Sequence, residues 1–287
     1  RMTAALSIAF DGLAYAMILF LISVGLSVTM GLMGFANLAH GAFAMVGGYL
    51  SITLMREAGV PFVLACVLAF FGVAAISVVF ERVLYSRFYN KGELDQVLMT
   101  IGLVFMSIAA CTLIWGPVNV VPIMPDFLRT QVDLGFRDFP AYRTFLIGVS
   151  LVIIVALWYG IERTRFGAQI RASVDNRRMA QSIGINVNRL FTLTFALGSG
   201  LAGIGGALGI DVLGLTPFYA LEWLVQFMIV VAVGGLGSLR GAFVAALIIG
   251  VIDTAGKYYM PHAGAFFIYT ITIVILLWRP QGLFGRA

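Results

Sequence analysis

Residues 12–55 read GLAYAMILFLISVGLSVTMGLMGFANLAHGAFAMVGGYLSITLM and contain no charged side chain. A helix crosses the hydrocarbon core of a bilayer with roughly 20 apolar residues, because an unpaired backbone amide costs several kcal/mol there. The stretch is too long for one crossing and has the length of two. We therefore expect two membrane-spanning helices, with a break in the glycine-containing segment 31–41.

The rest of the chain repeats this pattern. Only 11% of its residues are charged and 61% are hydrophobic, whereas a soluble domain carries about 25% charged residues. The sequence predicts an all-α, polytopic transmembrane helical bundle of eight or nine spans, formed as a single domain over 1–287, with Gly-rich broken helices at 31–41 and 239–241. The further uncharged stretches are 58–80, 96–125, 144–161, 190–210, 223–239, 241–252 and 258–278.

Lys and Arg indicate which side each connection faces. The connections 81–95 and 162–189 are basic. In 116–143 arginines and aspartates balance each other, and the charged residues of 211–222 are all acidic. Basic loops remain in the cytoplasm. We therefore expect 162–189 and the C-terminus to be cytoplasmic and 116–143 to be an external loop. This loop bias also explains the net charge of +5, and we expect no nucleic-acid partner.

Motifs for chemistry are absent from the sequence. The nearest approach to a P-loop is Gly256-Lys257-Tyr258, which lacks both the upstream glycine and the Ser or Thr that would hold magnesium. His40 and His262 have no partner at the spacing of a metal site or a catalytic triad. We predict neither catalytic residues nor a metal site nor a cofactor, and hence no enzyme.

The acidic residues bear on how transport could be driven. Asp11, Glu222 and Asp253 lie near predicted span ends, and the span centres carry no charge. Ion-coupled carriers usually place ionisable groups at mid-membrane, although backbone carbonyls at broken helices can also bind ions. A self-sufficient secondary transporter or channel for a small solute therefore remains an alternative to a membrane subunit that is driven by a separate protein.

The basic connection ERTRFGAQIRASVDNRRMAQSIGINVNR (162–189) is longer than a link between two spans requires. Asp175 is expected to N-cap a short helix from Asn176 to Ile183, and Gly184 to form its left-handed C-cap. A short helix in such a connection indicates either a docking element for another protein or an interfacial helix on anionic lipid.

The side chains of this short helix favour a binding role. Met179, Ala180 and Ile183 are expected to share one apolar face. Arg177 and Arg178 make the start of the helix cationic, which its dipole disfavours, so an anionic partner surface would help.

Two glycine-rich segments share a pattern at an offset of 200 residues: GLMGFANLAHGAF (31–43) and GGLGSLRGAF (234–243). Interrupted segments at corresponding positions of two halves are typical of a substrate path, because broken helices turn backbone dipoles toward a cavity. Glycines are also the usual means of close helix packing in lipid, as GSGLAGIGGALG (198–209) suggests. Both interpretations stay open, and the candidate glycines of a path are Gly34, Gly41, Gly234 and Gly237.

Asn37 and His40 are the only strongly polar side chains in 31–43. They are our candidates to face a polar solute. The alternative for His40 is a hydrogen-bonded structural residue near a span end.

At these residues the chain resembles the LivH-type permease subunits of branched-chain amino-acid ABC transporters. GFANLAHGAFAMVGGYL (34–50) is similar to the family's Asn-x-x-His-Gly motif, and 163–189 resembles its cytoplasmic loop in length and order. LTFALGSGLAGIGGAL (193–208), VVAVGGLGSLRGAFVAALIIG (230–250) and RPQGLFGR (279–286) resemble its later segments.

This resemblance implies a permease subunit of a bacterial importer in the inner (cytoplasmic) membrane. Its partners would be a second, LivM-type permease, two ATP-binding cassette ATPases and a periplasmic substrate-binding protein. The segment 162–189 would be the coupling segment that inserts into a cleft on the ATPase, with Ala180 and Gly184 at the family's small-residue positions. The solute would be a branched-chain amino acid or a related small polar molecule, since members also carry urea, short amides and small carboxylates.

Overall fold

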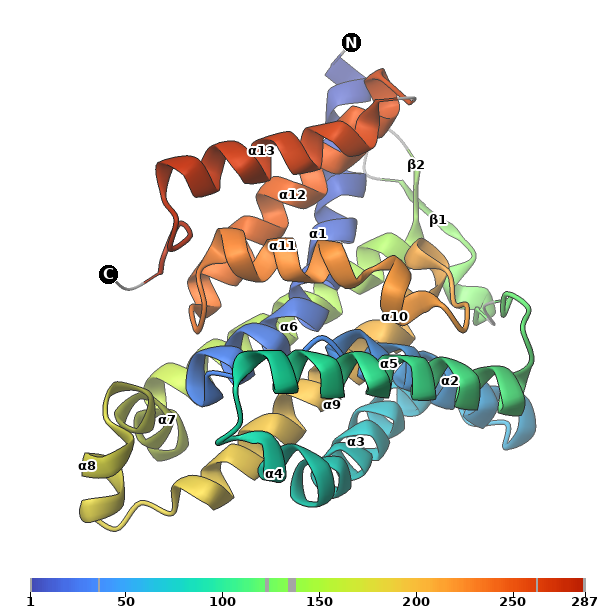
Figure 1. Ribbon diagram of the computed structural model, residues 1–287. Coiled ribbons are helices and arrows are strands. Elements are labelled where there is room, and N and C mark those ends of the chain that lie inside the picture. The colour runs from blue at the N-terminus through green and yellow to red at the C-terminus, as the bar shows by residue number, and fades with distance from the viewer. Residues whose placement is uncertain (1, 36, 122–123, 134–137, 262, 286–287) are drawn as a thin grey trace.

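The computed structural model describes residues 2–35, 37–121, 124–133, 138–261 and 263–285; His262 lies outside these ranges. Figure 1 shows a helical bundle with a small two-stranded hairpin (β1 and β2) at one end and two short helices (α7 and α8) at the other. The elements in chain order are α1 (Met2–Met33), α2 (His40–Glu57), α3 (Phe62–Phe80), η1 (Glu81–Tyr85), α4 (Ser86–Phe88), α5 (Glu93–Trp115), η2 (Asp126–Leu128), β1 (Gln131–Asp133), β2 (Asp138–Pro140), α6 (Ala141–Arg163), α7 (Arg165–Asp175), α8 (Arg177–Ser182), α9 (Val187–Leu213), α10 (Tyr219–Glu222), α11 (Leu224–Gly234), α12 (Leu239–Tyr259) and α13 (Gly264–Trp278).

Six helical stretches of the described residues are long and apolar enough to cross a membrane. Two further apolar helices, Tyr219–Gly234 and Phe266–Trp278, are shorter, and α2 lies outside both groups. The all-α polytopic class is confirmed, whereas the count of eight or nine spans stays a prediction. The six stretches are Ala5–Gly31, Phe62–Phe88, Glu93–Trp115, Ala141–Arg163, Val187–Leu213 and Leu239–Tyr259.

The helices α1 and α9 form the centre of the bundle. In their most apolar stretches 83% and 78% of the residues are buried, against 17% in α6. α1 packs against α12, α9 and α11, and α9 packs against α2, α3 and α1. A helix that is apolar all round is stable only when it is enclosed by protein or lipid, and the chain meets that need for α1 and α9 with its own outer helices.

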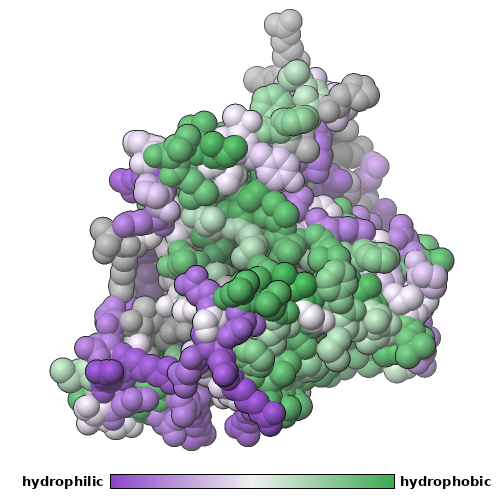
Figure 2. Space-filling view, viewed as in Figure 1, coloured by the Kyte–Doolittle hydropathy of each residue, from purple (hydrophilic) through white to green (hydrophobic). Residues whose placement is uncertain are grey.

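The outer helices turn large apolar side chains outward, for example Phe71 of α3, Leu113 of α5 and Val152 of α6. Figure 2 shows hydrophobic residues across the middle of the viewed face, and hydrophilic residues along the lower left edge, where Figure 1 places α7 and α8. An apolar band between polar ends is the surface that a bilayer requires.

Glycines bring the central helices into backbone contact. A Cβ atom on Gly25 of α1 would lie 2.2 Å from the carbonyl oxygen of Gly198 in α9, and one on Gly206 of α9 would lie 1.9 Å from that of Ala44 in α2. No side chain fits at either crossing. The prediction that 198–209 serves close helix packing is confirmed.

The two predicted breaks have different outcomes. The first is confirmed, because α1 ends at Met33 and α2 begins at His40. The second break lies within the predicted glycine-rich segment 234–243 but a few residues before 239–241, since α11 ends at Gly234 and α12 begins at Leu239. Gly235 and Gly237 have φ values of 94° and 74°. Ser238 Oγ then accepts a hydrogen bond from the Gly241 amide at 3.0 Å, which caps α12 before the predicted break.

The connection predicted at 116–143 runs from the end of α5 at Trp115 to the start of α6 at Ala141. It contains η2 and a short antiparallel hairpin in which Val132 pairs with Phe139. The purely α-helical expectation missed this hairpin, because strands of three residues are too short to show an alternating pattern.

Candidate functional site

The connection between α6 and α9 folds into two short helices rather than the one predicted. Thr164 Oγ1 accepts from the Gly167 amide at 3.3 Å and caps α7. Asn186 Oδ1 accepts from the Arg189 amide at 3.0 Å and caps α9. The sequence signal for α7 is the pair Phe166 and Ile170, whose i, i+4 spacing places both on one helix face.

The capping residue of α8 is Asn176, not Asp175 as predicted. Asn176 Oδ1 accepts from the Met179 amide at 2.9 Å, while Asp175 is the last residue of α7. Both residue types cap helices well, but only Asn176 leaves the helical backbone conformation, with φ −155° and ψ 98°. The prediction for Gly184 is confirmed, since its φ is 88° and the next amide, of Ile185, donates to Ala180 O at 3.0 Å.

The predicted apolar face of α8 is wrong for one of its three residues. Ala180 is only 2% exposed, because it packs against a small cluster formed by Ile170, Val187, Leu190 and Phe191. Met179 and Ile183 are 61% and 69% exposed. Ile183 is the C-cap of α8 and follows Met179 by four residues, so the two form an apolar pair on the outer surface at the end of α8. We call these two residues the α8 pair.

The two arginines at the start of α8 are exposed, but Arg177 is held by its own chain. Its guanidinium carbon lies 5.0 Å from the centre of the Phe191 ring, and it donates to Asn188 Oδ1 at 3.5 Å. Arg178 thus stands beside the α8 pair on a helix whose orientation the Arg177–Phe191 contact helps to set.

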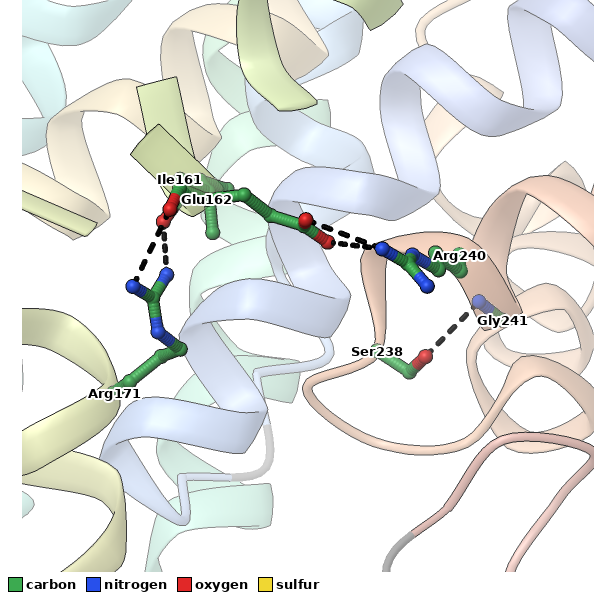
Figure 3. A network of polar contacts seen from close by, with 6 residues as sticks. All are labelled: Ile161, Glu162, Arg171, Ser238, Arg240 and Gly241. Carbon is green, nitrogen blue, oxygen red and sulfur yellow. Dashed lines mark hydrogen bonds and ion pairs between the residues drawn. The ribbon is translucent and has the colours of Figure 1, made fainter. Parts of the chain in front are cut away.

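A cavity of about 250 Å³ lies beneath α7. Its lining residues come from the last turns of α1, the end of α6, α7, the turn between α11 and α12, the start of α12 and Phe284 near the C-terminus. Figure 3 shows the polar contacts around it. Glu162 accepts two hydrogen bonds from Arg240 at 2.9 and 3.1 Å, and Arg171 donates to the backbone carbonyls of Ile161 and Glu162. α7 is therefore attached to the end of α6, and the end of α6 to the start of α12.

The glycines of the two matched segments lie in three kinds of environment. Gly237 lines the cavity, and its amide donates to Ser27 O at 3.1 Å. Gly234 and Gly41 face backbone atoms, those of Gly241 and Ala220 respectively. Gly34 forms a turn with φ 61° and has open space where a Cβ atom would lie. A Cβ atom on Gly31 would lie 2.3 Å from Cα of Gly237, so the two segments meet there.

Asn37 and His40 are each 1% exposed. Asn37 Oδ1 accepts from the Tyr85 hydroxyl at 2.9 Å and from the Ala39 amide at 3.1 Å. His40 Nε2 bonds to Ile22 O at 2.9 Å. In this conformation both side chains tie α1 and η1 to the start of α2, while Asn37 Nδ2 and His40 Nδ1 have no hydrogen-bond partner within the described part of the chain.

Sequence reasoning missed Glu81, which it counted as part of a basic loop. Glu81 is 3% exposed in the π-helical turn η1 and accepts hydrogen bonds from the hydroxyls of Tyr89 and Thr192. Burial first, and then the bond to Glu81, raise the pKa of Tyr89, which therefore keeps its proton and donates. A lone acidic residue at the end of an apolar run was the available signal.

Comparisons with known proteins agree with this architecture. The family model for the permease component of the branched-chain amino acid transport system matches residues 8–277. The high-affinity branched-chain amino acid transport system permease protein LivH of Escherichia coli K12 is 27% identical, over 96% of this chain and 94% of that protein. The corresponding protein BraD of Pseudomonas aeruginosa is 26% identical over the same shares.

Among solved structures, PsaBC from Streptococcus pneumoniae in complex with Fab has a similar fold. The TM-score is 0.51 with 14% sequence identity, and the match covers 93% of this chain and 89% of that chain. At this identity the likeness concerns the fold alone.

Proposed function

The chain belongs to the family of permease components of branched-chain amino acid transport systems, and from that premise we propose that it forms the translocation path of an importer for branched-chain amino acids or related small polar solutes. It is a multi-pass membrane protein of a transport family and not an enzyme. The family implies ATPase and binding-protein partners. The specific assembly we propose has a LivM-type permease beside this chain, two ATPase subunits and a periplasmic binding protein.

The proposed orientation follows the charge of the connections. α7, α8 and the C-terminus face the cytoplasm of a bacterial inner membrane, and the β1–β2 hairpin faces outward. The whole chain is one transmembrane domain of eight or nine spans, in which α2, α11 and α13 complete the six long helices. The segment 162–189 is the coupling segment, and 116–143 is the external loop.

The observation that carries the proposal is the α8 pair. Apolar side chains exposed at the polar end of a membrane protein gain free energy when a partner covers them, and Met179 and Ile183 are about two-thirds exposed. The capping bonds of Asn176 and the buried Ala180 hold α8 in one orientation, so the pair is preorganised for docking. Gly184 follows Ile183 in the sequence and terminates the helix in a left-handed conformation. We propose that an ATPase subunit binds to the surface of α8 that carries Met179 and Ile183.

We propose further that the force of the ATPase reaches the membrane helices through the contacts around the cavity. α7 is bonded to the end of α6 by Arg171, and Glu162 is bonded to Arg240 at the start of α12. The break between α11 and α12, with its two left-handed glycines, is the natural hinge. Gly34, Gly41, Gly234 and Gly237, with Asn37 and His40, remain the residues proposed to accompany the solute path.

The experiment uses the assembled importer in proteoliposomes. Ile183→Asp, which puts a charge on the α8 pair, should abolish ATP-driven uptake and release the ATPase from the permease. Gln181→Asp is the matched control, because it adds the same charge to an exposed position on the other side of α8. The docking assignment is wrong if Ile183→Asp couples ATP hydrolysis to uptake as well as the control does.

A second measurement tests the alternative class. Purified alone and reconstituted, a secondary transporter would move solute down an ion gradient. The proposed permease subunit should show no such flux until its partner subunits and ATP are added.

A further inference from the structure

Four buried polar groups without a hydrogen-bond partner meet around Tyr15 of α1. The Tyr15 and Tyr219 hydroxyls, Trp223 Nε1 and Asp253 Oδ1 all have no partner among the described residues. Tyr219 is 1% and Asp253 2% exposed. A buried polar group of this kind loses its hydration without compensation unless something binds it.

These groups belong to one cluster. The rings of Tyr15 and Trp223 are 6.3 Å apart, and those of Trp223 and Tyr219 are 6.5 Å apart. Asp253 joins this cluster through Lys257, whose Nζ pairs with the Asp253 carboxylate and lies over the Tyr15 ring. The members come from α1, α10, α12 and the residue after α10, so the fold and not one helix assembles them.

The two carboxylate oxygens of Asp253 differ in their hydrogen bonding. Its Oδ2 accepts from Lys257 Nζ at 2.6 Å, and its Oδ1 has no partner in the described ranges. The Lys257 side chain is 58% exposed and its Nζ lies 5.6 Å from the centre of the Tyr15 ring. The site therefore offers a buried, negatively charged hydrogen-bond acceptor, a half-exposed cation next to it, and aromatic rings beside both.

The cluster lies at the hairpin end of the bundle. Asp11, one helical turn before Tyr15, pairs with Arg143 in the first turn of α6, and Phe10 contacts Phe139 of β2 at 4.2 Å between ring centres. α6 runs from there to α7, which places the α8 pair roughly 30 Å away at the other end of the helix. In the orientation proposed above, the cluster faces the side from which solute arrives.

We propose that Asp253 and Lys257, with Tyr15, Tyr219 and Trp223, form a binding site for the zwitterionic head group of an α-amino acid, an inference that rests on the proposed transport function. The ammonium of the solute donates to Asp253 Oδ1, and its carboxylate accepts from Lys257 Nζ. The free hydroxyl and indole donors satisfy the remaining carboxylate lone pairs. The rings of Tyr15 and Trp223 pack against an aliphatic side chain.

The test measures direct binding to the purified, assembled importer in nanodiscs, without binding protein. Leucine should bind more tightly than isovalerate, which lacks the ammonium, and than isopentylamine, which lacks the carboxylate. Asp253→Asn should weaken leucine binding at least about tenfold, as expected for the loss of a charge-assisted hydrogen bond. Asp11→Asn is the matched control: it removes an acidic charge from the same end of the bundle and should leave leucine binding unchanged.

Tyr219→Phe tests the site independently, in case the Asp253 variant fails to fold. It removes one hydroxyl and keeps the ring. It should weaken leucine binding without lowering the melting temperature of the leucine-free complex. Equal binding of leucine and isovalerate, or unchanged leucine binding in both Asp253→Asn and Tyr219→Phe, would overturn the site. ATP-driven leucine uptake by the wild-type importer with its binding protein tests the proposed function separately, so a failed site and a failed function give different results.

Discussion

Replacing Gly206 with alanine should destabilise the bundle at its centre. The added Cβ atom would lie 1.9 Å from the Ala44 carbonyl oxygen and 2.6 Å from its carbon. Ordinary contact begins at 3.4 Å, so α2 and α9 must separate locally by about 1.5 Å. The obstacle is backbone, which no change of rotamer removes. Overpacking of this kind costs about 1–3 kcal/mol, against a gain of about 1 kcal/mol from alanine's higher helix propensity.

The assay is thermal unfolding of the purified complex, followed by tryptophan fluorescence. Since 1 kcal/mol shifts the melting temperature of a domain of comparable size by about 2–4 °C, the net loss of up to about 2 kcal/mol should lower it by as much as about 8 °C. The matched control is Gly148→Ala, because Gly148 lies within α6 and has open space where a Cβ atom would lie. It should leave the melting temperature unchanged or raise it. Equal melting temperatures for the two variants would refute backbone contact between α2 and α9.

Three further predictions concern polar contacts. Asn176→Ala should cost about 1 kcal/mol of local helix stability, seen as faster hydrogen exchange at the α8 amides with unchanged exchange in α9. Glu162→Arg should reduce ATP-driven uptake, and adding Arg240→Glu to it should restore uptake. The melting temperature should stay nearly unchanged in both variants, since exposed ion pairs contribute about 0–1 kcal/mol. Failure of the double variant to recover uptake would argue against a role of this ion pair in force transmission. Tyr85→Phe leaves Asn37 Oδ1 with one hydrogen bond instead of two and should lower the melting temperature by about 2–4 °C, with an unchanged value contradicting the bond.

The membrane helices could be predicted because their cause is local. A run of uncharged residues as long as 12–55 has no stable place in water, whatever the rest of the chain does. The left-handed Gly184 is also a local matter, since a glycine after a short helix adopts positive φ without strain. Both predictions needed no knowledge of tertiary contacts.

Other features depended on neighbours distant in sequence. Asp175 and Asn176 are equally good caps, and the fold of α7 decided between them. Ala180 turned inward because Ile170 and Phe191 lie beneath it, which the spacing of apolar residues within α8 does not reveal. Asp253 looked like a residue near a span end, but the packing of α12 against α1 buries it. Such residues need the assembled bundle, because their environment comes from other helices.

The backbone contacts between the central helices also limit which motions can accompany transport. Sliding α9 past α1 or α2 would move Gly198 and Gly206 away from the backbone atoms of Gly25 and Ala44 that they face, and a residue with a Cβ atom does not fit at either contact. We therefore expect the register of α9 against α1 and against α2 to stay unchanged during transport. In the proposed transport cycle we therefore expect the exposure of the path to change through rotation of the outer helices against α1, α2 and α9.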